Sequence, residues 1–90
     1  MQLNKLIVEF IGTFLFLSVI LVSGQPLPVA ITLAAVLYFG AKTSGGHFNP
    51  AVSTMFFAKG DINLNTLLGY VLVQVVAGIT ALHFKKNILV

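Results

Sequence analysis

Three long apolar runs dominate the chain, covering residues 6–23, 27–41 and 64–84. A helix needs about 20 mostly apolar residues to cross the hydrocarbon core of a membrane. Scattered polar side chains interrupt the runs, and Glu9 is the only Asp, Glu, Lys or Arg residue within them. The pattern therefore predicts three membrane-spanning helices in an all-α protein.

The first run also admits a second interpretation. Asn4 and Lys5 precede it, and a cleavage point near Ser23 and Gly24 would make it a secretory signal peptide. The run is long for such a peptide and contains the carboxylate of Glu9. Both features favour the spanning helix.

Residues 42–61, between the second and third runs, read as a break followed by a short helix. Residues 44–46 are Ser-Gly-Gly, a flexible sequence that breaks helices. Asn49 is a preferred N-cap, and Pro50 is favoured at the first helical position. A lysine and a glycine then end the helix. A helix over 50–59 would be about 15 Å long, which is half of the hydrocarbon core.

The short helix is too apolar for a loop in water, since it carries Val52, Met55 and Phe56. We interpret it as a re-entrant half-helix that dips into the membrane. Irregular backbone at that depth is tolerated only where it lines a cavity or is packed in protein. The preceding residues would then present carbonyl oxygens to a polar pathway: Gly45, Gly46, His47 and Phe48. An ordinary N-capped helix at the membrane interface remains the alternative.

The N-terminus of the half-helix predicts a particular selectivity. It carries roughly half a positive charge, and the side chain of Asn49 adds NH₂ donors beside it. Fixed donors next to a positive dipole orient water oxygens inward and repel cations, protons included.

Composition excludes several classes of function. Hydrophobic residues are 58% of the 90 residues and charged residues 8%, against about 45–50% and about 25% in soluble domains. A net charge of +3 is too sparse for a phosphate-binding patch, so no nucleic-acid partner is expected. The chain has no Cys, and His47 and His83 are too far apart in sequence to suggest a metal site. No catalytic arrangement is visible, and we expect neither enzyme activity nor a cofactor.

Residues 44–52, Ser-Gly-Gly-His-Phe-Asn-Pro-Ala-Val, resemble the signature loop of the aquaporin and aquaglyceroporin family, the major intrinsic proteins. Residues 9–14 resemble the first-helix motif of that family, and residues 69–78 resemble its third helix. The resemblance implies an Asn-Pro-Ala motif at the pore, formed here by Asn49, Pro50 and Ala51. It also implies a multi-pass protein of the plasma or inner cell membrane.

Members of this family contain two inverted repeats, each of three spans and one half-helix. The present sequence resembles the first repeat only, as a single repeat over residues 1–90, and one repeat cannot enclose a pore. Two explanations stay open: an inactive fragment of a longer aquaporin, or a half-channel completed by an inverted copy or a separate chain. The resemblance implies passive permeation of water or small neutral solutes such as glycerol, active only when two halves associate. A higher oligomer, such as a tetramer of pores, is a further expectation.

The resemblance also places residues around the pathway. The family usually has an aromatic residue twenty positions before the Asn, and here that position is Val29. The Arg that completes the family's filter follows the second Asn-Pro-Ala; its equivalent here is Val52, and the chain has no Arg. Phe16 and Leu33 resemble positions of the apolar pore wall, although lipid-facing packing is the alternative. A self-paired channel would therefore have a wide, apolar constriction.

Glu9 lies within a predicted span, where an unpartnered carboxylate is costly. By resemblance, Glu9 is a brace that accepts hydrogen bonds from the re-entrant loop and from His47. Gln74, in the third span, is expected to brace the same loop. The alternative for Glu9 is proton coupling, as in small dual-topology exporters, which also place a Glu in the first helix.

Overall fold

The computed structural model describes residues 2–89, and within them it is all-helical. The four helices are α1 (Leu3–Val22), α2 (Pro26–Ser44), α3 (Pro50–Lys59) and α4 (Leu64–Asn87). The first, second and fourth are long and apolar enough to cross a membrane. The predicted fold class is thereby confirmed.

The long helices extend beyond the apolar runs that predicted them. Helix α1 begins at Leu3 rather than at residue 6, and α4 continues to Asn87 rather than ending at 84. Helix α2 continues past residue 41 to Ser44, because its stop comes only at Gly45, whose φ of 92° is left-handed. Hydrophobicity marks the part of a helix in the hydrocarbon, whereas the backbone stays helical until a capping residue.

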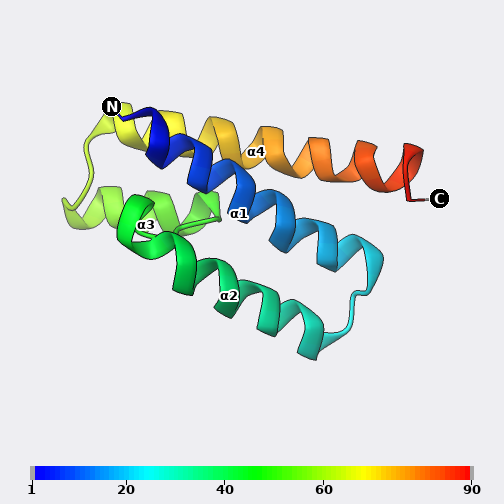
Figure 1. Cartoon of the computed structure of the whole chain (residues 1–90). Coiled ribbons are helices and arrows are strands. Elements are labelled where there is room, and N and C mark those ends of the chain that lie inside the picture. Colours follow the sequence, from blue (N-terminus) through cyan, green and yellow to red (C-terminus); the bar gives the residue numbers. More distant parts are fainter. Residues whose placement is uncertain (1, 90) are drawn as a thin grey trace.

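Helix α1 is the centre of the arrangement (Figure 1). It packs against α2 on one side and α4 on the other, while α3 packs on α4. After α2 the chain turns back toward the middle of the bundle, and α3 then runs outward to the end where α2 stopped (Figure 1). The N-terminus of α3 thus lies near the middle of the long axis of the bundle, as a re-entrant path requires.

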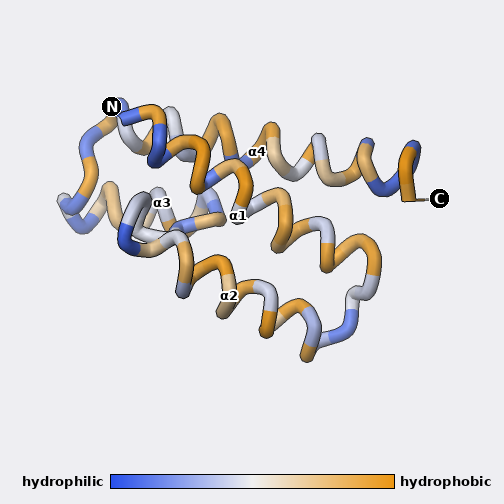
Figure 2. The backbone as a smooth tube through the Cα atoms, in the orientation of Figure 1, coloured by the Kyte–Doolittle hydropathy of each residue, from blue (hydrophilic) through white to orange (hydrophobic). Residues whose placement is uncertain are grey.

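Burial is inverted relative to a soluble protein. Many large apolar side chains are exposed, among them Ile11, Leu27 and Leu72. Apolar residues also predominate along α1, α2 and α4 in the hydropathy colours (Figure 2). The most deeply buried side chains include polar ones: Glu9 and Ser53 have no exposed surface, and Gln74 has 1%. Apolar side chains contact lipid at no cost, so the polar groups gather inside, where they can bind one another.

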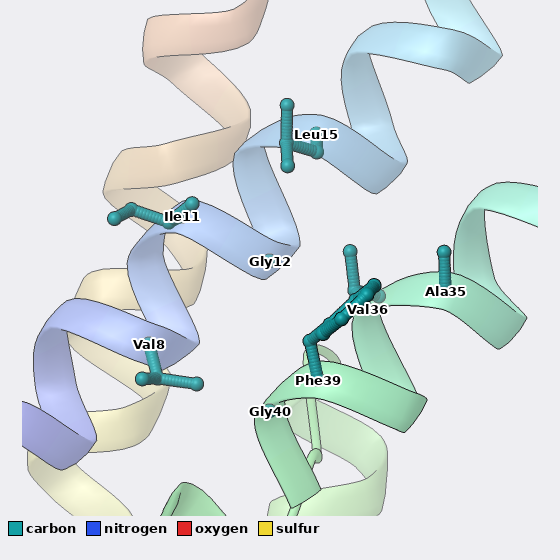
Figure 3. Close-up of a pocket in the computed structure, with 8 residues that line it drawn as sticks. All are labelled: Val8, Ile11, Gly12, Leu15, Ala35, Val36, Phe39 and Gly40. Carbon is teal, nitrogen blue, oxygen red and sulfur yellow. The ribbon is translucent and has the colours of Figure 1, made fainter.

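An apolar groove of about 350 Å³ runs between α1 and α2 (Figure 3). Its walls include Val8, Leu15 and Phe39, and two glycines, Gly12 and Gly40, lie on facing turns of the helices. The groove has no charged or hydrogen-bonding side chain in its lining, so it offers nothing to orient a polar solute. The polar site lies elsewhere, at the loop between α2 and α3.

Candidate functional site

The loop before α3 is built from left-handed backbone. Gly45 and Gly46 have φ of 92° and 68°, and Phe48 has φ of 55°. Glycine adopts such angles without a Cβ clash, which is why the Gly-Gly pair stands at the end of α2. Asn49 then caps α3, its Oδ1 accepting from the Ala51 amide at 2.8 Å. The Asn-Pro signal in the sequence therefore marks the true start of the helix.

The carboxylate of Glu9 collects four hydrogen bonds. Its Oε1 accepts from the Phe48 amide at 2.7 Å and from Gln74 Nε2 at 3.0 Å. Its Oε2 accepts from Ser44 Oγ at 2.6 Å and from the His47 amide at 3.0 Å. A carboxylate has about four acceptor positions, so every one is used. One side chain of α1 thus joins the end of α2, the re-entrant loop and α4.

A second set of contacts ties α3 to the same carboxylate. Gln74 Nε2 also donates to Ser53 Oγ at 3.0 Å, and Ser53 Oγ lies 2.8 Å from His47 Nδ1. The imidazole of His47 therefore pairs with Ser53, while only its backbone amide reaches Glu9. Gln74 Oε1 has no hydrogen-bond partner among the described residues. The amide of Gln74 thus contributes to the site through its nitrogen alone, which binds Glu9 of α1 and Ser53 of α3.

Aromatic rings enclose the imidazole. His47 stacks on Phe56 with ring centroids 4.8 Å apart, and Tyr70 meets it edge-on at 5.0 Å. The imidazole of His47 is thus a packed hydrogen-bonding group, held between two aromatic rings and paired with Ser53.

The tip of the loop presents a small polar surface. Asn49 and Ala51 are exposed, as is Gly45, whereas residues 46–48 are buried. The carbonyls of residues 45–48 accept no hydrogen bond from the described part of the chain, and Asn49 Nδ2 donates to none of it. Backbone carbonyls and side-chain amides need hydrogen-bond partners, so these groups retain hydrogen-bonding capacity. Gly45 and Asn49 are the exposed residues among those that carry them.

The predicted wall residues are spread over three helices. Phe16 lies on α1, Val29 and Leu33 on α2, and Val52 on α3, and all four are half-buried. Within the described residues α2 and α3 do not pack against each other, so Val29 is not brought against Val52. This chain by itself does not assemble a constriction from these side chains.

Several contacts of the site were absent from the sequence-based prediction. Ser44 donates to Glu9, and Ser53 pairs with the imidazole of His47. Tyr70 Oη donates to the Ser44 carbonyl at 2.5 Å and so joins α4 to the end of α2. A hydroxyl inside an apolar half-helix was a usable signal for Ser53, because a polar group at membrane depth needs a partner. Tyr70 offered no such signal, since Tyr is common at membrane interfaces.

Comparison with known proteins decides the family. The sequence profile described as Major intrinsic protein matches residues 1–89. This chain belongs to the major intrinsic protein family. Members of the family are channels rather than enzymes, and the chain is, like them, an integral multi-pass membrane protein.

Relatives occur in bacteria and plants. The chain is 33% identical to glycerol uptake facilitator protein-like 6 of Lactiplantibacillus plantarum, over 94% of this chain and 44% of that protein. It is 35% identical to aquaporin Z of Brucella melitensis, over 89% of this chain and 42% of that protein. It is 32% identical to aquaporin NIP3-1 of Arabidopsis thaliana, over 87% of this chain and 28% of that protein. No solved structure matches the chain.

The chain thus spans less than half the length of these relatives. Their names describe both glycerol facilitators and aquaporins, so family membership does not choose between solutes. The match to one part of longer proteins is what the resemblance to a first repeat predicts.

Proposed function

We propose that this chain forms one half of a passive channel for water or small neutral solutes such as glycerol. It conducts only when a second half-repeat closes the pathway, supplied by an inverted copy or by a separate chain. The observation that carries this proposal is the exposed N-terminus of α3 near the middle of the long axis of the bundle, capped by Asn49. The names of the relatives, aquaporin and glycerol uptake facilitator, support the same class of solute.

The chemistry of this tip suits neutral hydrogen-bonding solutes. The free Nδ2 of Asn49 donates to a solute oxygen, and the carbonyl of Gly45 accepts from its hydroxyl. The positive end of α3 raises the energy of a cation or a proton at the same place. The four hydrogen bonds on Glu9 hold the loop so that the tip keeps this geometry.

The proposed bracing role of Glu9 also argues against proton coupling. A carboxylate that carries protons across a membrane must be reached by water and must exchange its partners. Glu9 has no exposed surface, and each of its oxygens already accepts two hydrogen bonds. We therefore favour the channel over the small exporter.

The need for two halves predicts how flux depends on protein density. We expect water permeability of vesicles holding the chain alone to rise with the square of protein density, because pairing follows mass action. Stopped-flow measurement of osmotic shrinkage at increasing protein-to-lipid ratios tests this. A linear rise from the lowest density would contradict the need for association. Flux no faster than bare lipid at every density, with the protein inserted, would rule out self-pairing and leave a separate second half as the partner.

Val29 is expected to leave the constriction of a self-paired channel wide. Val29→Phe should lower glycerol permeability by about tenfold, an added barrier of about 1.4 kcal/mol, and reduce water permeability much less. The measurement compares glycerol and water gradients on the same vesicles. Ile31→Phe is the matched control, since Ile31 is 59% exposed and lies on another face of α2. Equal losses of both fluxes in Val29→Phe would remove Val29 from the constriction.

A further inference from the structure

Phe48 has an unusual backbone for a residue with a large side chain. It is the one non-glycine residue with positive φ among residues 2–89, at 55°. The left-handed region brings Cβ close to the following carbonyl, so a Phe there must be held by its surroundings. Phe48 is also 2% exposed. The surroundings of Phe48 therefore hold its ring in place, one residue before Asn49.

The ring occupies a slot between two glycines of different helices. A Cβ added at Gly12 of α1 would lie 2.2 Å from Phe48 Cε1, and one added at Gly40 of α2 would lie 2.9 Å from Cζ. Contacts under 3.0 Å are not compatible with real side chains, so both positions exclude any larger residue while the ring stays in place. Figure 3 shows the two glycines on facing turns of α1 and α2.

The slot and the carboxylate lie on the same face of α1, because residues three apart are neighbours on a helix. Glu9 holds the amides of His47 and Phe48, but any amino acid other than proline at these positions would supply the same amides. These hydrogen bonds thus hold the loop to Glu9 whatever side chains the two residues carry. The ring of Phe48 makes a separate contact, with α1 and α2.

We propose that Phe48 is a positioning residue of the channel, and that its ring, inserted between Gly12 and Gly40, sets the depth and direction of the loop that carries Asn49. The inference rests on the proposed function only for the role of Asn49. The contact itself belongs to this chain and needs no second half.

A double-mutant cycle tests the contact directly in the full chain. The variants are Gly12→Ala, Phe48→Ala and the double variant, purified in detergent, with amide hydrogen exchange of residues 47 and 48 followed by NMR. We expect Gly12→Ala to accelerate this exchange by about tenfold or more, because the methyl group expels the ring and frees the loop. Phe48→Ala should do the same. When Phe48→Ala is already present, Gly12→Ala should have no further effect, since there is no ring to expel.

Gly78→Ala is the matched control, because its new Cβ would meet only the flexible side chain of Leu17, at 3.1 Å. It should leave exchange at residues 47 and 48 unchanged, and the amides around Ala81 should stay protected in every variant. If Gly12→Ala accelerates exchange equally with and without Phe48→Ala, or in neither case, the proposal is overturned. If Gly12→Ala cannot be purified, Gly40→Ala replaces it in the same cycle. Every variant then also carries Val8→Ala, because a Cβ at Gly40 would lie 2.9 Å from Val8 Cγ1 as well.

The cycle separates this inference from the proposed function, since it measures exchange and not flux. Absence of any channel activity would leave the ring and its slot as they are. Conversely, an additive cycle would remove the positioning role of Phe48 without touching the case for permeation.

Discussion

Glu9→Ala is expected to destabilise the chain more than any other single substitution at the site. The change removes the acceptor of four donors. The amides of His47 and Phe48 lose their one partner among the described residues, whereas Gln74 Nε2 keeps Ser53 Oγ and Ser44 Oγ keeps the Gly40 carbonyl. Each unsatisfied buried donor costs about 1–3 kcal/mol, and partial rearrangement makes the sum smaller than four times that. We expect a loss on the order of 5 kcal/mol, measured as the free energy of unfolding in detergent or bicelles.

Glu9→Gln should have a smaller effect of the same kind. The Gln side chain keeps the shape and one acceptor oxygen, but its NH₂ group faces two donors. Destabilisation of the loop should exceed any change in solute selectivity. Asp61→Asn is the control, because Asp61 is 48% exposed and its ion pair with Lys59 lies at the surface. A Glu9→Ala variant as stable as Asp61→Asn would contradict the bracing role, and a proton-driven flux abolished by Glu9→Gln would revive the exporter.

Asn49→Asp is expected to produce the largest change in selectivity. It places a negative charge at the tip of α3, where the proposed function requires a positive field. A unit charge about 4 Å from a cation contributes about 4 kcal/mol at an effective dielectric constant of 20. Even a fraction of this energy should raise proton and cation leakage by about tenfold or more. The measurement is proton flux into vesicles that hold a pH-sensitive dye, on a preparation that conducts water.

The control for this variant is Asn65→Asp, an equal change of charge at an exposed position in the first turn of α4. It should leave proton leakage unchanged. Unaltered exclusion of protons in Asn49→Asp, with water flux retained, would mean that Asn49 and the dipole of α3 do not provide the barrier.

Local signals in the sequence were enough for the helices and for the start of α3. Asn49 caps α3 and Pro50 begins it, as the Asn-Pro pair predicts, because capping depends on residues adjacent in the chain. The ends of the spanning helices were less well predicted. An apolar run indicates which part of a helix contacts lipid. It does not indicate how many helical turns follow beyond the lipid, up to residues such as Ser44 and Asn87.

The partners within the site were harder to predict, because they join residues far apart in the chain. Glu9 could be singled out, since a carboxylate inside a span needs donors. The sequence did not tell that Ser53, rather than Glu9, would meet the imidazole of His47. The insertion of Phe48 between two glycines was equally hidden, because Phe and Gly are ordinary residues in spanning helices.

The four hydrogen bonds on Glu9 have a consequence for the order of events during synthesis. The carboxylate is synthesised before its donors, which follow 35 to 65 positions later in the chain. While α1 enters the membrane, its charge has no partner, and a charge at the centre of a bilayer costs about 2.5–3.5 kcal/mol by insertion measurements. We therefore expect α1 to lie at a shallow depth in the membrane, or to keep water around Glu9, until Gln74 has been synthesised. We expect Glu9 to acquire its full set of donors only once α4 has been made, because Gln74 lies 65 positions after Glu9.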